Sequence, residues 1–243
     1  MATATAGTGA GVFGALLQRT IGLKLLMAVT GLIWVGFVAQ HMVANLQVFM
    51  PMPADGVHPL NRYAAALQSL GGLLWVARIF LLVVFVAHVY AAIRLTQLNR
   101  AARPVDYRVR TTQVSTFSSS YMRVSGFALL FFVLYHLAHF TFGAVDQAAY
   151  ARTLPGGMHD VYGMVIVGFR NPIAAGTYIV ANVFLALHLH HAVSSIFQTL
   201  GLRTPRYAPL IDKLGPAVGL AVGAGNIAMP LAILLGLVGQ GVS

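Results

Sequence analysis

The chain has 243 residues, of which 58% are hydrophobic and only 8% are charged, and it contains neither Cys nor Glu. Soluble domains carry about 25% charged residues, so this composition predicts a protein whose apolar surface faces lipid. The missing Cys excludes disulfides, thiolate-bound zinc and Cys-ligated iron–sulfur clusters, and the missing Glu excludes a helical Glu-x-x-His di-iron site. The formal net charge is +10, but the basic residues lie mainly between apolar segments, which indicates membrane orientation and not nucleic-acid binding.

Five apolar segments are long enough to cross a bilayer, which takes about 20 residues of helix. Helices are expected because lipid offers no hydrogen-bond partners to an open backbone. Proline- and glycine-containing stretches separate the segments, as breakers do between helices. We therefore predict an all-α integral membrane protein, a single domain over residues 1–243, with five transmembrane helices in one bundle at 22–49, 68–98, 121–144, 171–200 and 215–238.

Residues 1–20 precede the first helix and lack a basic start before an apolar run, so we expect an N-terminal arm and not a cleaved signal peptide. Basic residues are concentrated before the first helix, between the second and third, and between the fourth and fifth. Such loops stay on the cytoplasmic side of a membrane. The N-terminal arm is therefore predicted in the cytoplasm and the C-terminus outside, with the chain in the inner (cytoplasmic) membrane of a bacterium.

The fifth segment carries no ionisable residue after Lys213, but Gly215, Gly219 and Gly223 repeat every four residues along it. Small residues at this spacing form a smooth helix face that another helix can approach closely in lipid. We interpret the fifth helix as a packing or oligomer surface in preference to a cofactor helix.

Seven of the nine histidines lie inside the apolar segments, and each of the first four predicted helices carries at least one. An ionisable side chain in lipid is costly, so each is a functional candidate. An interhelical hydrogen bond would explain a single histidine equally well, but this distribution favours metal or haem ligation. No Asp lies within a spanning segment, so haem iron is favoured over a transported ion, and a histidine-lined metal-ion transporter is the alternative.

Four segments, one on each of the first four predicted helices, carry recognisable motifs. They read Met27-Ala-Val-Thr-Gly31 followed by QHMVANLQVF, RIFLLVVFVAHVYAAIRL, MRVSGFALLFFVLYHLAHF and LALHLHHAVSSIFQTLGL. Together they resemble the cytochrome b membrane anchor of succinate dehydrogenases and fumarate reductases, in its single-chain, five-helix form. The resemblance covers residues 19–203. It implies two haem b groups with two histidine ligands each, at His41 and His136 (ten residues after Gly31 and Gly126), His88 (in AHVYAA) and His188 (thirteen residues before Gly201).

The depth of these four histidines predicts which of them pair. Helices one and three run outward, and His41 and His136 lie about 28 and 22 Å from the inner ends, in the outer half. Helices two and four run inward, and His88 and His188 lie about 30 and 26 Å from the outer ends, in the inner half. Because one iron needs two imidazoles at one depth, we expect His41 to pair with His136 and His88 with His188.

Haem propionates need cationic or hydrogen-bonding partners. Arg78 lies inside helix two, where a propionate or another buried acidic partner is expected. Arg123 begins helix three, and snorkelling to the interface explains it equally well. His139 and His191 each lie three residues after one of the four implied ligands, on a similar helix face, and are expected to bond to a propionate or to another helix.

The resemblance also implies partners and a function. Such a chain anchors a flavoprotein subunit, which oxidises succinate, and an iron–sulfur subunit on the cytoplasmic side. It passes electrons through its haems to a membrane quinone, expected to be menaquinone in this type, within a complex that can form higher oligomers. The chain itself would carry no succinate chemistry. A cytochrome b anchor of another dehydrogenase, such as a hydrogenase, is the alternative.

The quinone pocket is less clearly marked. Gln18, Arg19 and Lys24 lie at the predicted cytoplasmic interface and are candidates for quinone binding, although contact with lipid headgroups explains them equally well. Some members of the family have a Glu near the outer start of helix two that is linked to quinol oxidation or proton movement. This chain has no Glu, so we do not expect proton transfer across the membrane by that route.

Overall fold

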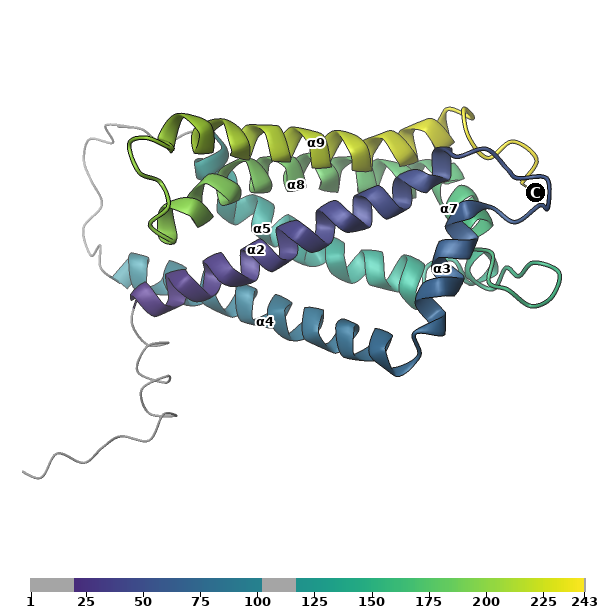
Figure 1. Cartoon of the computed structure of the whole chain (residues 1–243), viewed down its shortest axis with the longest axis horizontal. Coiled ribbons are helices and arrows are strands. Elements are labelled where there is room, and N and C mark those ends of the chain that lie inside the picture. The colour runs from purple at the N-terminus through teal and green to yellow at the C-terminus, as the bar shows by residue number, and fades with distance from the viewer. Residues whose placement is uncertain (1–19, 102–116, 243) are drawn as a thin grey trace, which may run out of the picture.

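The structure is a computed structural model that describes residues 20–101 and 117–242. Every regular element in these two ranges is helical, and the β structure there is limited to an isolated bridge between Thr153 and His159. Five of the helices in these two ranges are long and apolar enough to span a membrane, as predicted (Figure 1). They are α2 (Thr20–Asn45, followed by the short helix η1, Leu46–Phe49), α4 (Gly72–Ala101), α5 (Phe117–His136, followed by the π-helical turn η2, Leu137–Thr141), α8 (Pro172–Thr199) and α9 (Ala208–Leu234).

Three shorter helices, α3 (Pro59–Ser69), α6 (Gln147–Tyr150) and α7 (Val161–Arg170), gather at one end of the bundle, on the same side as the C-terminus (Figure 1). We call this end the α7 end. At the opposite end α2, α5 and α9 begin and α4 and α8 finish. We call it the basic end, because it carries exposed cations that include Lys24, Arg123 and Arg203.

The central helix of the bundle is α8, which packs against α9, α5 and α2, while α4 packs against α2. The glycines of α9 make the closest of these contacts. A Cβ on Gly219 would lie 2.6 Å from the carbonyl oxygen of Ala186, and one on Gly215 would overlap the carbonyl oxygen of His190. The glycine face predicted on the fifth helix is therefore used for packing against α8 inside the bundle.

The largest buried apolar cluster fills the α7 end. Because α7 is apolar on nearly all sides, it needs cover from several elements, and Ile166 and Phe169 are fully buried among side chains of α5, α8 and α9. Asp160 caps α7 by accepting the Gly163 N–H at 2.9 Å, and Asn61 of α3 donates to the same carboxylate at 2.9 Å. We predicted only a connection in this stretch, but the structure makes it part of the core.

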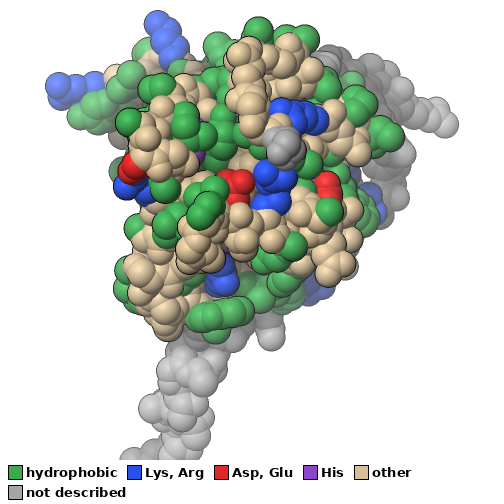
Figure 2. Space-filling view, turned by 90° about the vertical axis from the view of Figure 1, so that its right-hand side faces the viewer, with side chains coloured by type: hydrophobic (Ala, Val, Ile, Leu, Met, Phe, Trp, Pro, Cys, Tyr) green, Lys and Arg blue, Asp and Glu red, His purple; other side chains and the backbone are tan. Residues whose placement is uncertain are grey.

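His58 ties α3 to the chain before it. Its ring is fully buried, accepts the Leu60 N–H at Nδ1 (3.2 Å), donates from Nε2 to the Met50 carbonyl (3.1 Å) and stacks on Tyr162 at 3.8 Å. Burial is the main cause that lowers the pKa of His58 below its ordinary value. Acidic and basic side chains lie close together on the surface around this end (Figure 2).

Two observed boundaries differ from the predicted ones for reasons that the structure makes clear. The helix predicted at 68–98 begins only at Gly72, because α3 is a separate helix that ends at Ser69. The helix predicted at 215–238 begins earlier, at Ala208, since Pro209 occupies its first turn, where a proline removes no intrahelical hydrogen bond. The predicted N-terminal arm, apart from its last residue, lies outside the described residues.

Candidate functional site

The four predicted ligands come together as two pairs, each built across two helices. His41 on α2 and His136 at the end of α5 form the α7-end pair, with ring centroids 5.8 Å apart and ring planes nearly perpendicular, at 87°. A bond from a histidine nitrogen to a metal is about 2 Å long, so two rings that share one metal have centroids about 6 Å apart. The separation of this pair therefore suits one iron between the two rings.

The basic-end pair consists of His88 on α4 and His188 on α8, whose rings are near enough to interact electrostatically. Each ring meets a hydroxyl group from a neighbouring helix. Thr30 Oγ1 on α2 lies 3.0 Å from His88 Nδ1, and Ser125 Oγ on α5 lies 3.2 Å from His188 Nδ1. When Nδ1 is engaged in this way, Nε2 is the nitrogen that can bind a metal.

Two glycines lie against the basic-end pair. A Cβ on Gly31 would lie 3.4 Å from His88 Cε1, and one on Gly126 would lie 3.8 Å from His188 Cε1. Each glycine therefore faces a histidine of one pair, while the histidine ten residues later on its own helix belongs to the other pair. The helices α2 and α5 thus contribute to both pairs in the same manner.

Aromatic side chains surround the α7-end pair. The hydroxyl of the buried Tyr178 on α8 lies 3.2 Å from His136 Nδ1, and Phe37 stacks on His41 with centroids 5.5 Å apart. Directly after His136 the helix widens into η2, and π-helical turns of this kind are rare but frequent at functional sites. This turn contains His139, which is also buried beside Tyr178, with centroids 5.7 Å apart.

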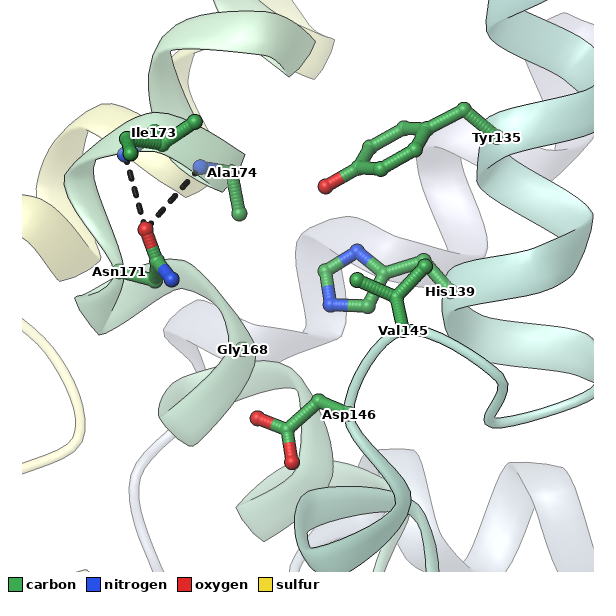
Figure 3. Close-up of a pocket in the computed structure, with 8 residues that line it drawn as sticks. All are labelled: Tyr135, His139, Val145, Asp146, Gly168, Asn171, Ile173 and Ala174. Atoms are coloured by element: carbon green, nitrogen blue, oxygen red, sulfur yellow. Dashed lines mark hydrogen bonds between the residues drawn. The ribbon is translucent and has the colours of Figure 1, made fainter.

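A cavity of about 200 Å³ lies beside η2, and His139 of its lining follows His136 by three residues. Figure 3 shows the hydroxyl of Tyr135, the ring of His139 and the carboxylate of Asp146 facing Asn171 and Ala174 across it. His139 is only 3% exposed, and its Nδ1 has no hydrogen-bond partner among the described residues. Val145, Ile173 and Gly168 complete the lining. A phenol, an imidazole and a carboxylate between apolar walls suit a small, uncharged ring that carries hydrogen-bonding oxygens.

The structure does not bring the predicted arginines to the histidine pairs. Arg78 is exposed on α4, six residues after the helix begins, and its guanidinium lies 5.1 Å from the ring centre of Trp75. A long side chain this close to a helix end can reach the membrane surface, and the propionate or other acidic partner that we expected for Arg78 stays a prediction. Arg123 is exposed at the start of the membrane-spanning part of α5, a position from which its side chain can reach the membrane surface.

The remaining predicted residues lie in different places. His191 is near enough to His188 for the two rings to interact electrostatically. His191 Nε2 lies 3.1 Å from Ser195 Oγ, one turn further along α8. Lys24 is exposed at the basic end. Gln18 and Arg19 lie outside the described residues.

Sequence reasoning missed several polar residues around the pairs. Thr30 and Ser125 had a usable signal, since each directly precedes the glycine that stands ten residues before a predicted ligand. Tyr135 and Tyr178 had none, because a tyrosine in an apolar helix is an ordinary packing residue. Asp146 reaches the cavity from a loop, and its position depends on how α5 ends.

The residues present fit a haem iron held by two imidazoles. Haem iron takes only its axial ligands from the protein, and each pair supplies two imidazoles. Among residues 20–101 and 117–242, no group of three or more His or Asp side chains could hold a metal ion. Three of the four rings have Nδ1 opposite a hydroxyl group, which is the usual support of a metal-binding histidine.

No family model, curated protein or solved structure is significantly similar to the chain. We therefore base a function on the two histidine pairs and on the four sequence motifs.

Proposed function

We propose that the chain is the di-haem cytochrome b membrane anchor of a succinate:quinone oxidoreductase, that is, a succinate dehydrogenase or fumarate reductase. The observation that carries this proposal is the meeting of four histidines from four helices as two pairs. Histidines that served only as interhelical hydrogen-bonding groups would have no need to lie close to one another in pairs. The four sequence motifs resemble those of succinate dehydrogenase and fumarate reductase anchors, and this resemblance is the reason for naming succinate as the substrate of the complex.

Under this proposal, His41 and His136 hold one haem b, and His88 and His188 hold the other. Bound haem supplies one-electron transfer. The chain itself holds each iron between two imidazoles, and hydroxyl groups orient three of these rings. The surrounding apolar helices keep water away from the histidine pairs, which limits unwanted reactions between a reduced cofactor and solvent.

The same proposal assigns the two ends of the bundle. The basic end faces the cytoplasm, as expected from the positive-inside rule, and receives the iron–sulfur and flavoprotein subunits. Electrons enter at the basic-end pair and move to the α7-end pair, and the C-terminus lies outside. Succinate chemistry belongs to the flavoprotein partner.

The quinone, menaquinone by resemblance, has two candidate sites. Lys24 is an exposed cation at the basic end, which suits a headgroup of quinone or lipid equally well. The cavity at the α7 end is the better-formed site, since Tyr135, His139 and Asp146 converge on it and His139 follows His136 by three residues. A quinone ring that is reduced there takes up two protons, and His139 and Asp146 are two groups able to pass protons to its oxygens.

The decisive experiment is purification of the tagged chain from its native membranes in mild detergent. We expect a Soret band, two haem b per chain by the pyridine haemochrome assay, and co-purification of a flavin-containing and an iron–sulfur subunit with succinate–quinone activity. A preparation without a Soret band would overturn the proposal in favour of a metal transporter. Haem b together with partners that oxidise another substrate would show an anchor of a different dehydrogenase.

The quinone site is tested by comparing His139→Ala with Lys24→Ala. If the cavity is the site, His139→Ala lowers quinone-linked activity about 100-fold or more, the usual size of a general acid–base contribution. Succinate oxidation with an artificial acceptor should persist in both variants. The reverse result, with Lys24→Ala impaired and His139→Ala active, would place the quinone at the basic end.

A further inference from the structure

The basic-end histidines are both held by hydroxyl groups that come from the helices of the α7-end histidines. Thr30 reaches from α2 to His88 on α4, and Ser125 reaches from α5 to His188 on α8, with Nδ1 contacts of 3.0 and 3.2 Å. The two hydroxyl residues occupy equivalent positions, each directly before the glycine that faces the same ring. Two contacts of the same kind at equivalent positions of different helices indicate a shared role.

The direction of these hydrogen bonds follows from where each hydroxyl proton goes. Thr30 Oγ1 donates to the Leu26 carbonyl at 2.6 Å, one turn earlier on its own helix. Ser125 Oγ donates in the same way to the Met122 carbonyl at 3.1 Å. A hydroxyl group has one proton, so a hydroxyl that gives it to the carbonyl acts as an acceptor toward its ring, and Nδ1 of His88 and of His188 then carries the hydrogen.

Burial leaves each Nδ1–H group with the hydroxyl oxygen as its partner in place of water. Thr30 is 4% exposed and Ser125 is fully buried, so water does not offer an alternative partner to the Nδ1–H groups. The glycines beside them allow the rings to approach, since a side chain larger than methyl at Gly31 would press on His88 Cε1. The backbone of Met27 also lies near His88, so this ring has a second polar neighbour besides Thr30.

We infer that Thr30 and Ser125 are positioning residues that hold His88 and His188 in the Nδ1–H tautomer, with Nε2 turned toward the metal position between them. This inference rests on the proposed function, because it assigns the metal to haem iron. A hydrogen bond from Nδ1–H to an oxygen makes the ligating nitrogen more basic and stabilises the more oxidised metal. The two hydroxyls therefore hold the reduction potential of the basic-end haem below the value it would have without them.

The test compares Thr30→Val and Ser125→Ala with the wild-type chain in its purified complex. Loss of one such supporting bond typically weakens metal binding about 10- to 100-fold, so we expect easier loss of the basic-end haem and an upward shift of its midpoint potential. The shift should be larger for Ser125→Ala, because Met27 still supports His88 in Thr30→Val. The α7-end haem should keep its potential. Thr30→Ser and Ser125→Thr retain the hydroxyl and should restore wild-type values.

Thr96→Val is the matched control. Thr96 is partly buried on α4, and its hydroxyl donates to the Ala92 carbonyl at 2.8 Å, the same bond to its own helix that Thr30 makes. The Thr96→Val substitution should leave the midpoint potentials of both haems unchanged. Unaltered potentials in Thr30→Val and Ser125→Ala, or shifts as large in Thr96→Val, would overturn the inference.

A second readout separates this inference from the haem assignment. Selective ¹⁵N labelling of histidine in the full chain reports the tautomer of each ring by NMR, with or without a cofactor. In the wild-type chain we expect both His88 and His188 to be Nδ1–H tautomers. In Thr30→Val the ring of His88, and in Ser125→Ala the ring of His188, should become a mixture of the Nδ1–H and Nε2–H tautomers. If the chain proves to contain no haem, the proposed function fails, while the tautomers still decide whether the two hydroxyls position the rings. Nε2–H tautomers in the wild-type chain would refute the positioning role.

Discussion

Replacing Gly219 by Leu should loosen the contact between α8 and α9. A Cβ at this position would lie 2.6 Å from the Ala186 carbonyl oxygen and 3.0 Å from the His190 backbone nitrogen, and neither atom can move without moving α8. Ordinary van der Waals contact begins at 3.4 Å. Adding the leucine Cβ alone would therefore require α8 and α9 to move apart by about 0.8 Å at this point. Overpacking of this kind costs about 1–3 kcal/mol.

The matched control is Gly176→Leu on α8, because a Cβ on Gly176 would meet nothing within 4 Å. For a chain of this size, 1 kcal/mol corresponds to about 2–4 °C in the melting temperature. Thermal unfolding in detergent should therefore show Gly219→Leu several degrees below the wild type, and Gly176→Leu near or above it, since leucine favours helix by about 1 kcal/mol over glycine. An unchanged melting temperature for Gly219→Leu would refute the packing of these helices.

Three further outcomes are expected at the α7 end. The pKa of His58 is lower in the folded chain than in the unfolded chain, so the unfolded chain takes up the proton first as the pH falls. The stability that His58 adds is therefore complete above its ordinary pKa of 6.5 and declines below that value. The melting temperature of His58→Ala should depend less on pH between 7.5 and about 5 than that of the wild type, and equal slopes would contradict this. Arg170→Ala should speed proteolysis of the C-terminal residues, because the guanidinium donates to the carbonyls of Val242 (2.7 Å) and Gly239 (2.9 Å), and an unchanged cleavage rate would show that these bonds do not hold the tail. A topology reporter fused after Ser243 should be active only outside the cytoplasm, and activity inside would contradict the proposed orientation.

The sequence predicted the spanning helices well, because lipid imposes simple demands on length and hydrophobicity. It also predicted which histidines meet, since depth along a straight helix follows from residue number alone. The pairing of His41 with His136 needed no knowledge of side-chain contacts. The glycine face of α9 was recognisable for the same reason, as spacing alone defines a smooth helix face.

Features that depend on the third dimension were not predictable. The helix α7 looks like part of a loop in the sequence because it is too short to span, and only its burial by three other helices explains its apolar character. The turn η2 depends on how α5 ends against its neighbours, and it brings His139 to a cavity that no motif marks.

The most direct test of the central claim is the haem content of the purified complex carrying each of the four histidine variants. The wild-type chain should hold two haem b, and each single alanine variant should hold one. Redox titration should show that His41→Ala and His136→Ala lose the same haem, and that His88→Ala and His188→Ala lose the other. Loss of different haems from the His41 and His136 variants, or two haems retained in any of the four, would contradict the paired-histidine account.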